Sequence, residues 1–193
     1  MYPVVRALYH LGRESFRPRP HVLTEELRLS MRVMPWDCDA NLHINNGRYL
    51  TLMDLGRMQL FVRHGLLRRF MGRGWGVVAA SVHVVYHRPI NLFKAFQMGT
   101  RVAAATDKFM TIEHAMYSGE RMCTLAHVNV AFTDKRGIVP SVEVIKMLDL
   151  SRHQIPTITT IEQAARATDQ ALLAAIRRWN DQAGVSGQKH DKH

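Results

Sequence analysis

Three polar side chains of different chemistry occupy alternate positions in one short segment of the chain. Asp39, Asn41 and His43 place a carboxylate, a carboxamide and an imidazole at i, i+2 and i+4. In an extended or looped backbone these side chains can point the same way. A carboxylate or an imidazole can serve as a general base or a nucleophile. The segment therefore carries groups suited to hydrolysis of an acyl compound, provided that hydrogen-bond donors for the oxyanion lie nearby.

The residues that follow predict such donors at the start of a long helix. From about residue 46 to residue 64 the sequence is apolar nearly all round the helical repeat, which is typical of a buried helix. At about 1.5 Å per residue this helix would run about 28 Å, and Gly65 is suited to cap its C-terminus. Free N–H groups and the helix dipole favour negative charge at its start, near Asn46 and Gly47.

The same loop also has a purely structural interpretation. Asp37 and Asp39 belong to the residue types that form turns and Asx-type caps. Asn45 or Asn46 would serve as the helix N-cap, and His43 could act only as a hydrogen-bonding group. The residues alone leave both interpretations open.

Period-two alternation predicts strands through much of the remaining chain. Residues 27–33 alternate strictly, and Val77 to Tyr86 is nearly all apolar, which favours a strand covered on both faces. Further strands are expected at 96–106, 109–117, 122–132 and 138–139, with turns at 118–120 and 134–137. The strand region should end within residues 140–148. We therefore predict an α+β fold in which a curved antiparallel sheet wraps around the long central helix.

One main domain, residues 25–150, is expected between two terminal extensions. Residues 1–24 form an arginine-rich extension with apolar residues at helical spacing. This pattern predicts either a helix packed on the domain or an amphipathic segment in peripheral contact with anionic lipid. Residues 151–193 should contain a helix opened by a capping box of Thr159 and Glu162, followed by a disordered tail.

Composition narrows the classes of partner and compartment. The net charge of +10 and the pI near 10.2 favour anionic partners. Two distant cysteines, Cys38 and Cys123, indicate a reduced, cytoplasmic chain, with no signal peptide or membrane span expected. The carboxylates on either side of Cys38 should raise its thiol pKa and make it a poor nucleophile. The eleven histidines lack metal-ligand spacing, and the basic residues lack a nucleic-acid recognition motif, so we expect neither partner.

Two stretches resemble hotdog-fold thioesterases. Residues 37–50, DCDANLHINNGRYL, are similar to the D-x-D-x-N-x-H-x-N-N-x-x-Y signature of the 4-hydroxybenzoyl-CoA thioesterase group and of plant acyl-carrier-protein thioesterases. Residues 79–102, AASVHVVYHRPINLFKAFQMGTRV, are similar to the strand pair after the helix in the thioesterase superfamily member six group. The resemblance covers roughly residues 25–148, so the termini lie outside it.

The resemblance implies a hotdog fold and hydrolysis of an acyl-CoA or acyl-carrier-protein thioester. Asp39 would be the general base or nucleophile, with Asn41 and His43 completing the catalytic set. A further acidic residue of the plant enzymes has no counterpart here. The residues expected to contact substrate are Asn46, Gly47, Tyr49 and Arg88. The resemblance also implies a homodimer or homotetramer with its site at a subunit interface, and no cofactor besides the coenzyme A of the substrate.

The apolar interior beside the central helix would hold the acyl chain, and basic residues would meet the phosphates of coenzyme A. Candidate wall residues are Tyr49, Met53, Val77 and Val82. Candidate phosphate contacts are Arg88, Lys94, Arg101, Lys135 and Arg136. Two alternatives stay open: a non-catalytic acyl-CoA-binding or membrane-associated hotdog protein, and a hotdog hydratase. The hydratase motif resembles D-x-N-P-x-H, whereas this loop lacks the proline and is one residue shorter.

Overall fold

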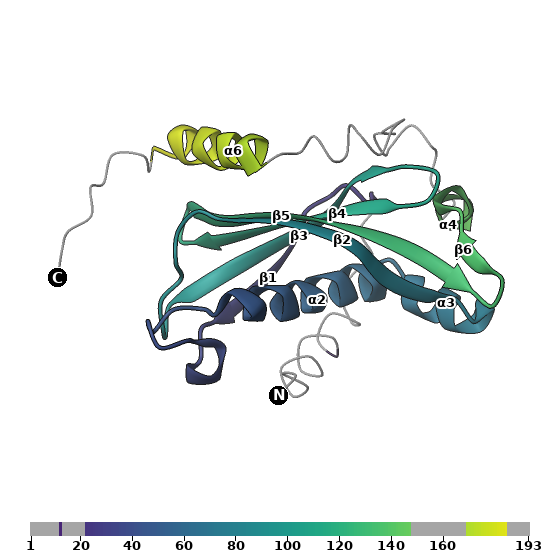
Figure 1. Ribbon diagram of the computed structural model, residues 1–193, viewed down its shortest axis with the longest axis horizontal. Helices are drawn as coiled ribbons and strands as arrows, with labels where there is room; N and C mark the ends of the chain where they lie inside the picture. Colours follow the sequence, from purple (N-terminus) through teal and green to yellow (C-terminus); the bar gives the residue numbers. More distant parts are fainter. Residues whose placement is uncertain (1–11, 13–21, 148–168, 185–193) are drawn as a thin grey trace.

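Six antiparallel strands form one curved sheet in the computed structural model, which describes residues 12, 22–147 and 169–184 (Figure 1). The strands are β1 (Leu27–Arg32), β2 (Gly76–Tyr86), β3 (Ala95–Ala105), β4 (Met110–Ser118), β5 (Arg121–Asp134) and β6 (Gly137–Val139). They lie in the order β1-β3-β4-β5-β2, and β6 pairs with the end of β5. The predicted α+β architecture is confirmed.

Helices cover both faces of this sheet. Helix α2 (Asn46–Arg63) lies along one face and α6 (Asp169–Gln182) along the other, while α3 (Leu66–Arg73) continues from the end of α2 (Figure 1). A short 3₁₀ turn, η1 (Pro35–Asp37), precedes the polar loop. Pro140 does not lead into more strand as expected, because Ser141–Met147 forms helix α4. In this short segment Val144 and Ile145 are buried while Glu143 is exposed, a burial pattern that strand alternation cannot satisfy.

The central helix packs on the sheet at a distance that requires glycine at one position. A Cβ atom on Gly56 would lie 2.4 Å from Oγ1 of Thr100 and 2.9 Å from Cε of Met98. The close approach places the helix axis over β3 and β4, and most of its girth is buried as predicted. The buried residues of α2 are Tyr49, Leu52, Met53, Leu55, Gly56, Gln59, Leu60 and Phe61.

A polar band divides the core under α2 into two apolar clusters. The cluster nearer the polar loop contains Tyr49, Met53, Met98 and Met116, and the other contains Leu60, Phe70, Val102 and Phe132. Between them, the Nδ1 atom of buried His114 lies 3.0 Å from Oγ1 of Thr100. The other ring nitrogen, Nε2, lies 3.4 Å from a guanidinium nitrogen of Arg57, which is paired with Asp54.

The expectation that β2 is covered on both faces is wrong for a single chain, because most of its side chains are exposed. The strand also lies at the edge of the sheet. It pairs with β5 and has no second strand neighbour within the described ranges. The side chains of Val78 and Val82 are 47% and 40% exposed. An apolar run has the same composition whether its own chain or another molecule covers it, and that is why the sequence could not distinguish the two cases.

Several predictions for the termini lie outside the described residues. These are the N-terminal segment apart from Gly12, the capping box of Thr159 and Glu162, and the tail after Gly184. Helix α6 ends at Gln182, and Gly184 has a left-handed φ of 69°, as expected just past a helix end. No helix in the part of the chain that the structure describes is both long and apolar enough to span a membrane.

The burial of His114 predicts a loss of stability in acid. Complete burial, and then the charges of Arg57 and His127, hold the pKa of His114 well below 6.5. The unfolded chain therefore takes up a proton below pH 6.5 that the folded chain refuses. This group alone should lower the free energy of unfolding by up to about 1.4 kcal/mol per pH unit below 6.5. Urea unfolding at several pH values on either side of 6.5 measures how steeply the free energy of unfolding falls with pH. In His114→Gln this pH dependence should be shallower. An unchanged pH dependence would show that His114 is not its source.

Candidate functional site

Asp37 anchors the polar loop to the first turns of α2. Its buried carboxylate accepts hydrogen bonds from the main-chain N–H of Met34 at 3.0 Å and from Nε of Arg48 at 2.9 Å. Its carbonyl oxygen accepts the N–H of Asn45 at 2.9 Å. The structural interpretation of Asp37 is therefore correct: this residue holds both ends of the loop and the helix together.

The loop itself folds back as a narrow hairpin beside the helix start. The N–H of Asp39 donates to the carbonyl of His43, and the N–H of Leu42 donates to the carbonyl of Asp39, both at 3.1 Å. Leu42 closes the turn with a φ of 58°, in the left-handed region of backbone conformation that residues other than glycine rarely adopt. The N–H of Ile44 then donates to the carbonyl of Ile90 at 3.0 Å, which ties the hairpin to the segment before β3.

Within this hairpin Asp39 and His43 come together, as the spacing predicts. The Oδ1 atom of Asp39 lies 3.6 Å from Nδ1 of His43, and the two side chains are 27% and 29% exposed. The same Oδ1 accepts the main-chain N–H of Asn41 at 2.9 Å, which forms the Asx turn named in the structural interpretation. The exposed carboxamide of Asn41 makes no hydrogen bond to other described residues. A carboxylate and an imidazole that share one small, partly exposed site can activate a water molecule.

The start of α2 supplies fewer free donors than expected. Asn45 is the N-cap, and its side-chain oxygen accepts the N–H of Gly47 at 2.9 Å. The N–H of Asn46 has no hydrogen-bond partner among the residues that the structure describes. Asn46 is therefore the main-chain donor at this helix start that could meet an oxyanion without breaking a bond already present.

The sequence reasoning missed Tyr86, which joins the edge strand to the helix start. Its hydroxyl donates to the carbonyl of Asn46 at 3.0 Å, and its ring lies 4.9 Å from the ring of Tyr49 in an edge-to-face arrangement. Burial raises the pKa of Tyr49 to about 12 and also raises the pKa of Tyr86. Both hydroxyls therefore stay protonated near neutral pH. The only signal in the sequence is an aromatic residue that ends an apolar strand.

The proposed phosphate contacts differ in their availability. Arg88 follows β2, and its buried Nε atom has no hydrogen-bond partner in the described ranges. Arg101 pairs with Glu113 at 2.7 Å and Arg136 pairs with Asp134 at 3.4 Å, so both already have carboxylate partners. The remaining two, Lys94 and Lys135, are exposed.

The Cys38 thiol in this loop is disfavoured as a nucleophile. Both cysteines are free thiols. Partial burial, and then the charges of Asp37 and Asp39, raise the pKa of the Cys38 thiol, in the direction expected from the sequence. Within the described residues no group of three or more His, Cys, Asp or Glu side chains could hold a metal ion.

A curved antiparallel sheet packed on a central helix defines a protein of the hotdog fold. The chain belongs to the Thioesterase-like superfamily, whose family model matches residues 33–172. That match includes the hairpin, α2 and every strand except β1.

Three known proteins illustrate the similarity. Protein THEM6 of Xenopus laevis is 34% identical over 91 residues, which are 47% of this chain and 44% of that protein, so the matched region spans less than half of the relative. A probable thioesterase from Bartonella henselae has a TM-score of 0.54 and 22% identity, covering 60% of this chain and 97% of that one. The protein SAV2348 from Staphylococcus aureus, solved in complex with CoA, has a TM-score of 0.56 and 14% identity, covering 75% and 95%. The structural similarities establish the hotdog fold.

Removal of the Asp37 carboxylate should destabilise the domain. Asp37→Ala leaves the nearly buried guanidinium of Arg48 without this partner and frees the N–H of Met34, so we expect a loss of about 3–5 kcal/mol in the free energy of unfolding. Chemical denaturation measures the loss. Asp37→Asn keeps the shape and one acceptor, and should lose less. A cost below about 1 kcal/mol for the alanine variant, in the range of exposed ion pairs, would contradict the anchoring role.

Proposed function

We propose that this chain hydrolyses acyl-CoA thioesters at the hairpin before α2. One observation carries the proposal: the Asp39 carboxylate lies 3.6 Å from the His43 imidazole beside the start of a buried helix, in a chain of the Thioesterase-like superfamily. Asn46, whose N–H has no partner among the described residues, lies at that helix start. A base and an oxyanion donor are the two groups that acyl hydrolysis requires.

Asp39 is the general base in the proposed reaction. Its carboxylate takes a proton from water while the oxygen of that water bonds to the thioester carbonyl carbon. The resulting oxyanion accepts a hydrogen bond from the N–H of Asn46. When the intermediate collapses, the carbon–sulfur bond breaks, and the thiolate takes up the proton held by Asp39 to leave as a thiol. Asn41 and His43 orient water and substrate. In the alternative route Asp39 attacks the carbonyl carbon directly, and the carbon–sulfur bond breaks to release the thiolate, which takes a proton from solvent. Water then hydrolyses the mixed anhydride and regenerates the Asp39 carboxylate.

Coenzyme A is the thiol carrier favoured by charge and by similarity. The chain carries a net charge of +10, which suits the phosphates of coenzyme A, and the structurally similar SAV2348 was solved with CoA. An acyl carrier protein is also acidic and remains the second substrate class that the charge would suit. The reaction needs no cofactor beyond the coenzyme A of the substrate.

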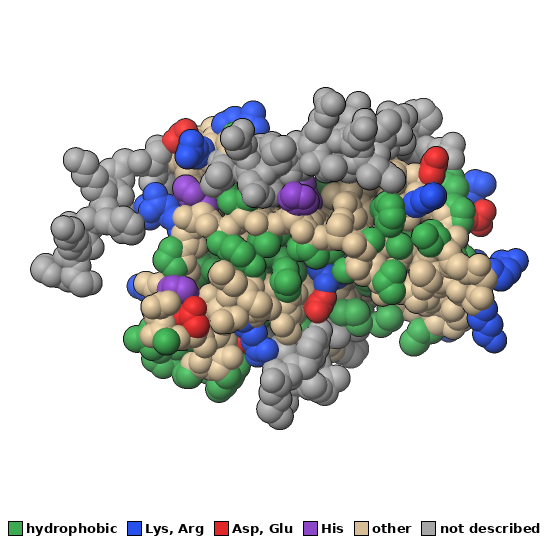
Figure 2. All heavy atoms as spheres, in the orientation of Figure 1, with side chains coloured by type: hydrophobic (Ala, Val, Ile, Leu, Met, Phe, Trp, Pro, Cys, Tyr) green, Lys and Arg blue, Asp and Glu red, His purple; other side chains and the backbone are tan. Residues whose placement is uncertain are grey.

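A second copy of the chain would complete the site along β2. This strand presents an unpaired edge in the described structure, and exposed side chains of Val78, Val82 and Tyr86 lie along it. Figure 2 shows hydrophobic side chains gathered in a band across this side of the molecule. A long apolar edge tends to pair with another strand. Because Tyr86 bonds to Asn46, a β2–β2 pairing would bring the partner subunit next to the start of α2.

Replacement of the proposed base should abolish turnover while the fold is kept. Asp39→Asn is isosteric and still accepts the N–H of Asn41, so the Asx turn should persist. We expect acyl-CoA hydrolysis to fall by at least about 10²-fold, the scale at which single catalytic groups act. Thiol release from a panel of acyl-CoAs measures it.

Asp107→Asn, a matched change at an exposed carboxylate outside the hairpin, should keep wild-type turnover. Near-wild-type activity of Asp39→Asn would remove Asp39 from the mechanism. Tight acyl-CoA binding by the wild type without thiol release would instead show that the chain is a non-catalytic acyl-CoA-binding protein.

A charge on the β2 edge should separate the subunits. Val82→Lys places an ammonium on the apolar edge, so we expect a monomer by light scattering and reduced thiol release. The matched control is Ile138→Lys on β6, where an exposed apolar side chain is separated from β2 by β5. It should leave the oligomeric state unchanged. A wild-type chain that is monomeric at assay concentrations would refute assembly through β2.

A further inference from the structure

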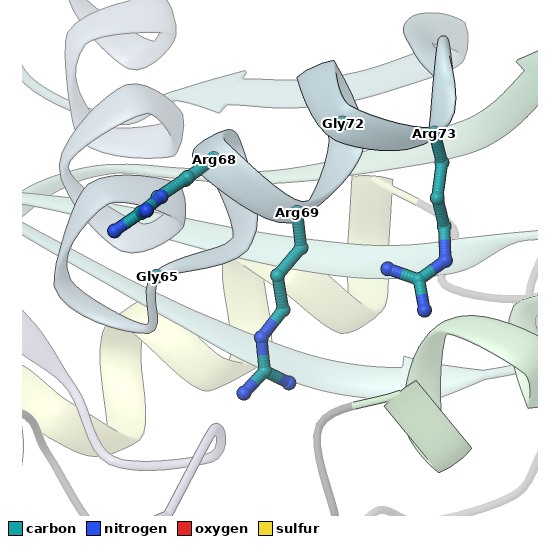
Figure 3. Close-up of a pocket in the computed structure, with 5 residues that line it drawn as sticks. All are labelled: Gly65, Arg68, Arg69, Gly72 and Arg73. Atoms are coloured by element: carbon teal, nitrogen blue, oxygen red, sulfur yellow. The ribbon is translucent and has the colours of Figure 1, made fainter.

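A basic hollow on helix α3 lies well away from the hairpin. Its volume is about 640 Å³, within the range of small-molecule pockets (Figure 3). The residues that line it are Gly65, Arg68, Arg69, Gly72 and Arg73. The 18 residues of α2 separate it from the hairpin by about 27 Å at about 1.5 Å per residue. The hollow is therefore distinct from the proposed catalytic site of the same chain.

Packing on the inner side of α3 holds the arginines on its outer side. The buried ring of Phe70 lies 5.2 Å from the ring of Phe132 on β5, which anchors the helix to the sheet. Arg68, Arg69 and Arg73 are exposed on the opposite side. Figure 3 shows Arg69 and Arg73 extending side by side from the helix, while Arg68 extends in another direction. The three guanidinium groups therefore extend from a helix whose position is fixed by its packing on the sheet.

No carboxylate among the described residues neutralises these three guanidinium groups. Arg69 donates to the main-chain carbonyl of Met147, and the guanidinium of Arg73 lies 5.6 Å from the ring centroid of Trp75. Like charges at i and i+4, as in Arg69 and Arg73, destabilise a helix. Repulsion between these arginines therefore destabilises helix α3 when no anion is bound. An anion in the hollow would offset that repulsion.

Gly72 keeps the space between the arginines open. Glycine within a helix is less favourable than alanine, and a Cβ atom at Gly72 would meet nothing within 4 Å. Packing therefore does not require glycine here. The residue is one turn beyond Arg68 and Arg69 and directly precedes Arg73, so a large side chain at this position would project into the hollow.

We propose that this hollow binds a phosphate group, carried either by a soluble molecule or by a phospholipid headgroup. Guanidinium groups match phosphate oxygens through paired charge-assisted hydrogen bonds, which favours phosphate over a simple halide. Three arginines around one hollow supply more donors than one carboxylate would accept. The site does not depend on the hydrolytic role of Asp39, so either assignment can fail while the other stands.

Binding measurements on the full chain test the proposal and identify the source of the phosphate. Inorganic phosphate and coenzyme A are titrated calorimetrically, and co-sedimentation uses phosphatidylcholine vesicles with and without phosphatidylserine. Because coenzyme A is also expected at the hairpin, only binding that the α3 substitutions described next weaken is attributed to the hollow. Such binding of either soluble probe indicates a soluble ligand, and such binding to the anionic vesicles alone indicates the lipid. Arg68→Gln combined with Arg73→Gln should weaken the observed binding at least about tenfold, because two charge-assisted hydrogen-bonding groups are lost.

Two matched controls separate a site from a general charge effect. Arg177→Gln combined with Arg178→Gln removes the same charge from exposed positions on α6 and should leave binding unchanged. Gly72→Leu fills the hollow without a change in charge and should weaken binding, whereas Gly72→Ala should not. If the α3 arginine variant fails to fold, the comparison of Gly72→Leu with Gly72→Ala still tests whether phosphate binds in the hollow. Absence of binding to every probe, or equal weakening by the α6 pair, would overturn the proposal.

Discussion

The close approach of α2 to the sheet is the constraint on which the structure depends. At Gly56 the helix lies so near β3 that a single Cβ atom would meet Thr100 at 2.4 Å. This contact fixes the depth of the helix against the sheet, and the apolar clusters on either side fix its direction. Because the helix is rigid, its position at Gly56 also determines where its first turn lies. The hairpin, Tyr86 and the end of β2 are then arranged around that first turn.

The hairpin illustrates how neighbouring carboxylates in one motif can take different roles. Asp37 is buried and bonded to Arg48, while Asp39, two residues later, is partly exposed beside His43. The same residue type therefore serves as an internal anchor in one position and is open to solvent in the other. The left-handed Leu42 and the main-chain hydrogen bonds to Ile90 and from Leu92 hold this difference in place.

Local patterns in the sequence predicted much of this fold, because strand alternation and the apolar helix reflect burial by the chain itself. Residues 27–33, the long helix and the turn at 118–120 all formed as the pattern required. The site was predictable as far as the pairing of Asp39 with His43, since two residues four apart in a tight hairpin must lie close. Tyr86 could not be found in this way, because its contact with Asn46 joins segments 40 residues apart in the chain. The exposure of β2 was equally hidden, because hydrophobicity does not say which molecule provides the cover.

The polar band of Thr100, His114 and Arg57 separates the interior into halves that can change independently. Substitutions in well-separated clusters generally add in their effects on stability, whereas those within one cluster are coupled. The half that contains Tyr49 and Met53 adjoins the hairpin, and the half that contains Phe70 supports the basic helix α3. Side chains beside the hairpin can therefore vary in size and shape during evolution without disturbing the far end of the molecule. A fold divided in this way is suited to diversify at one end while its scaffold stays constant.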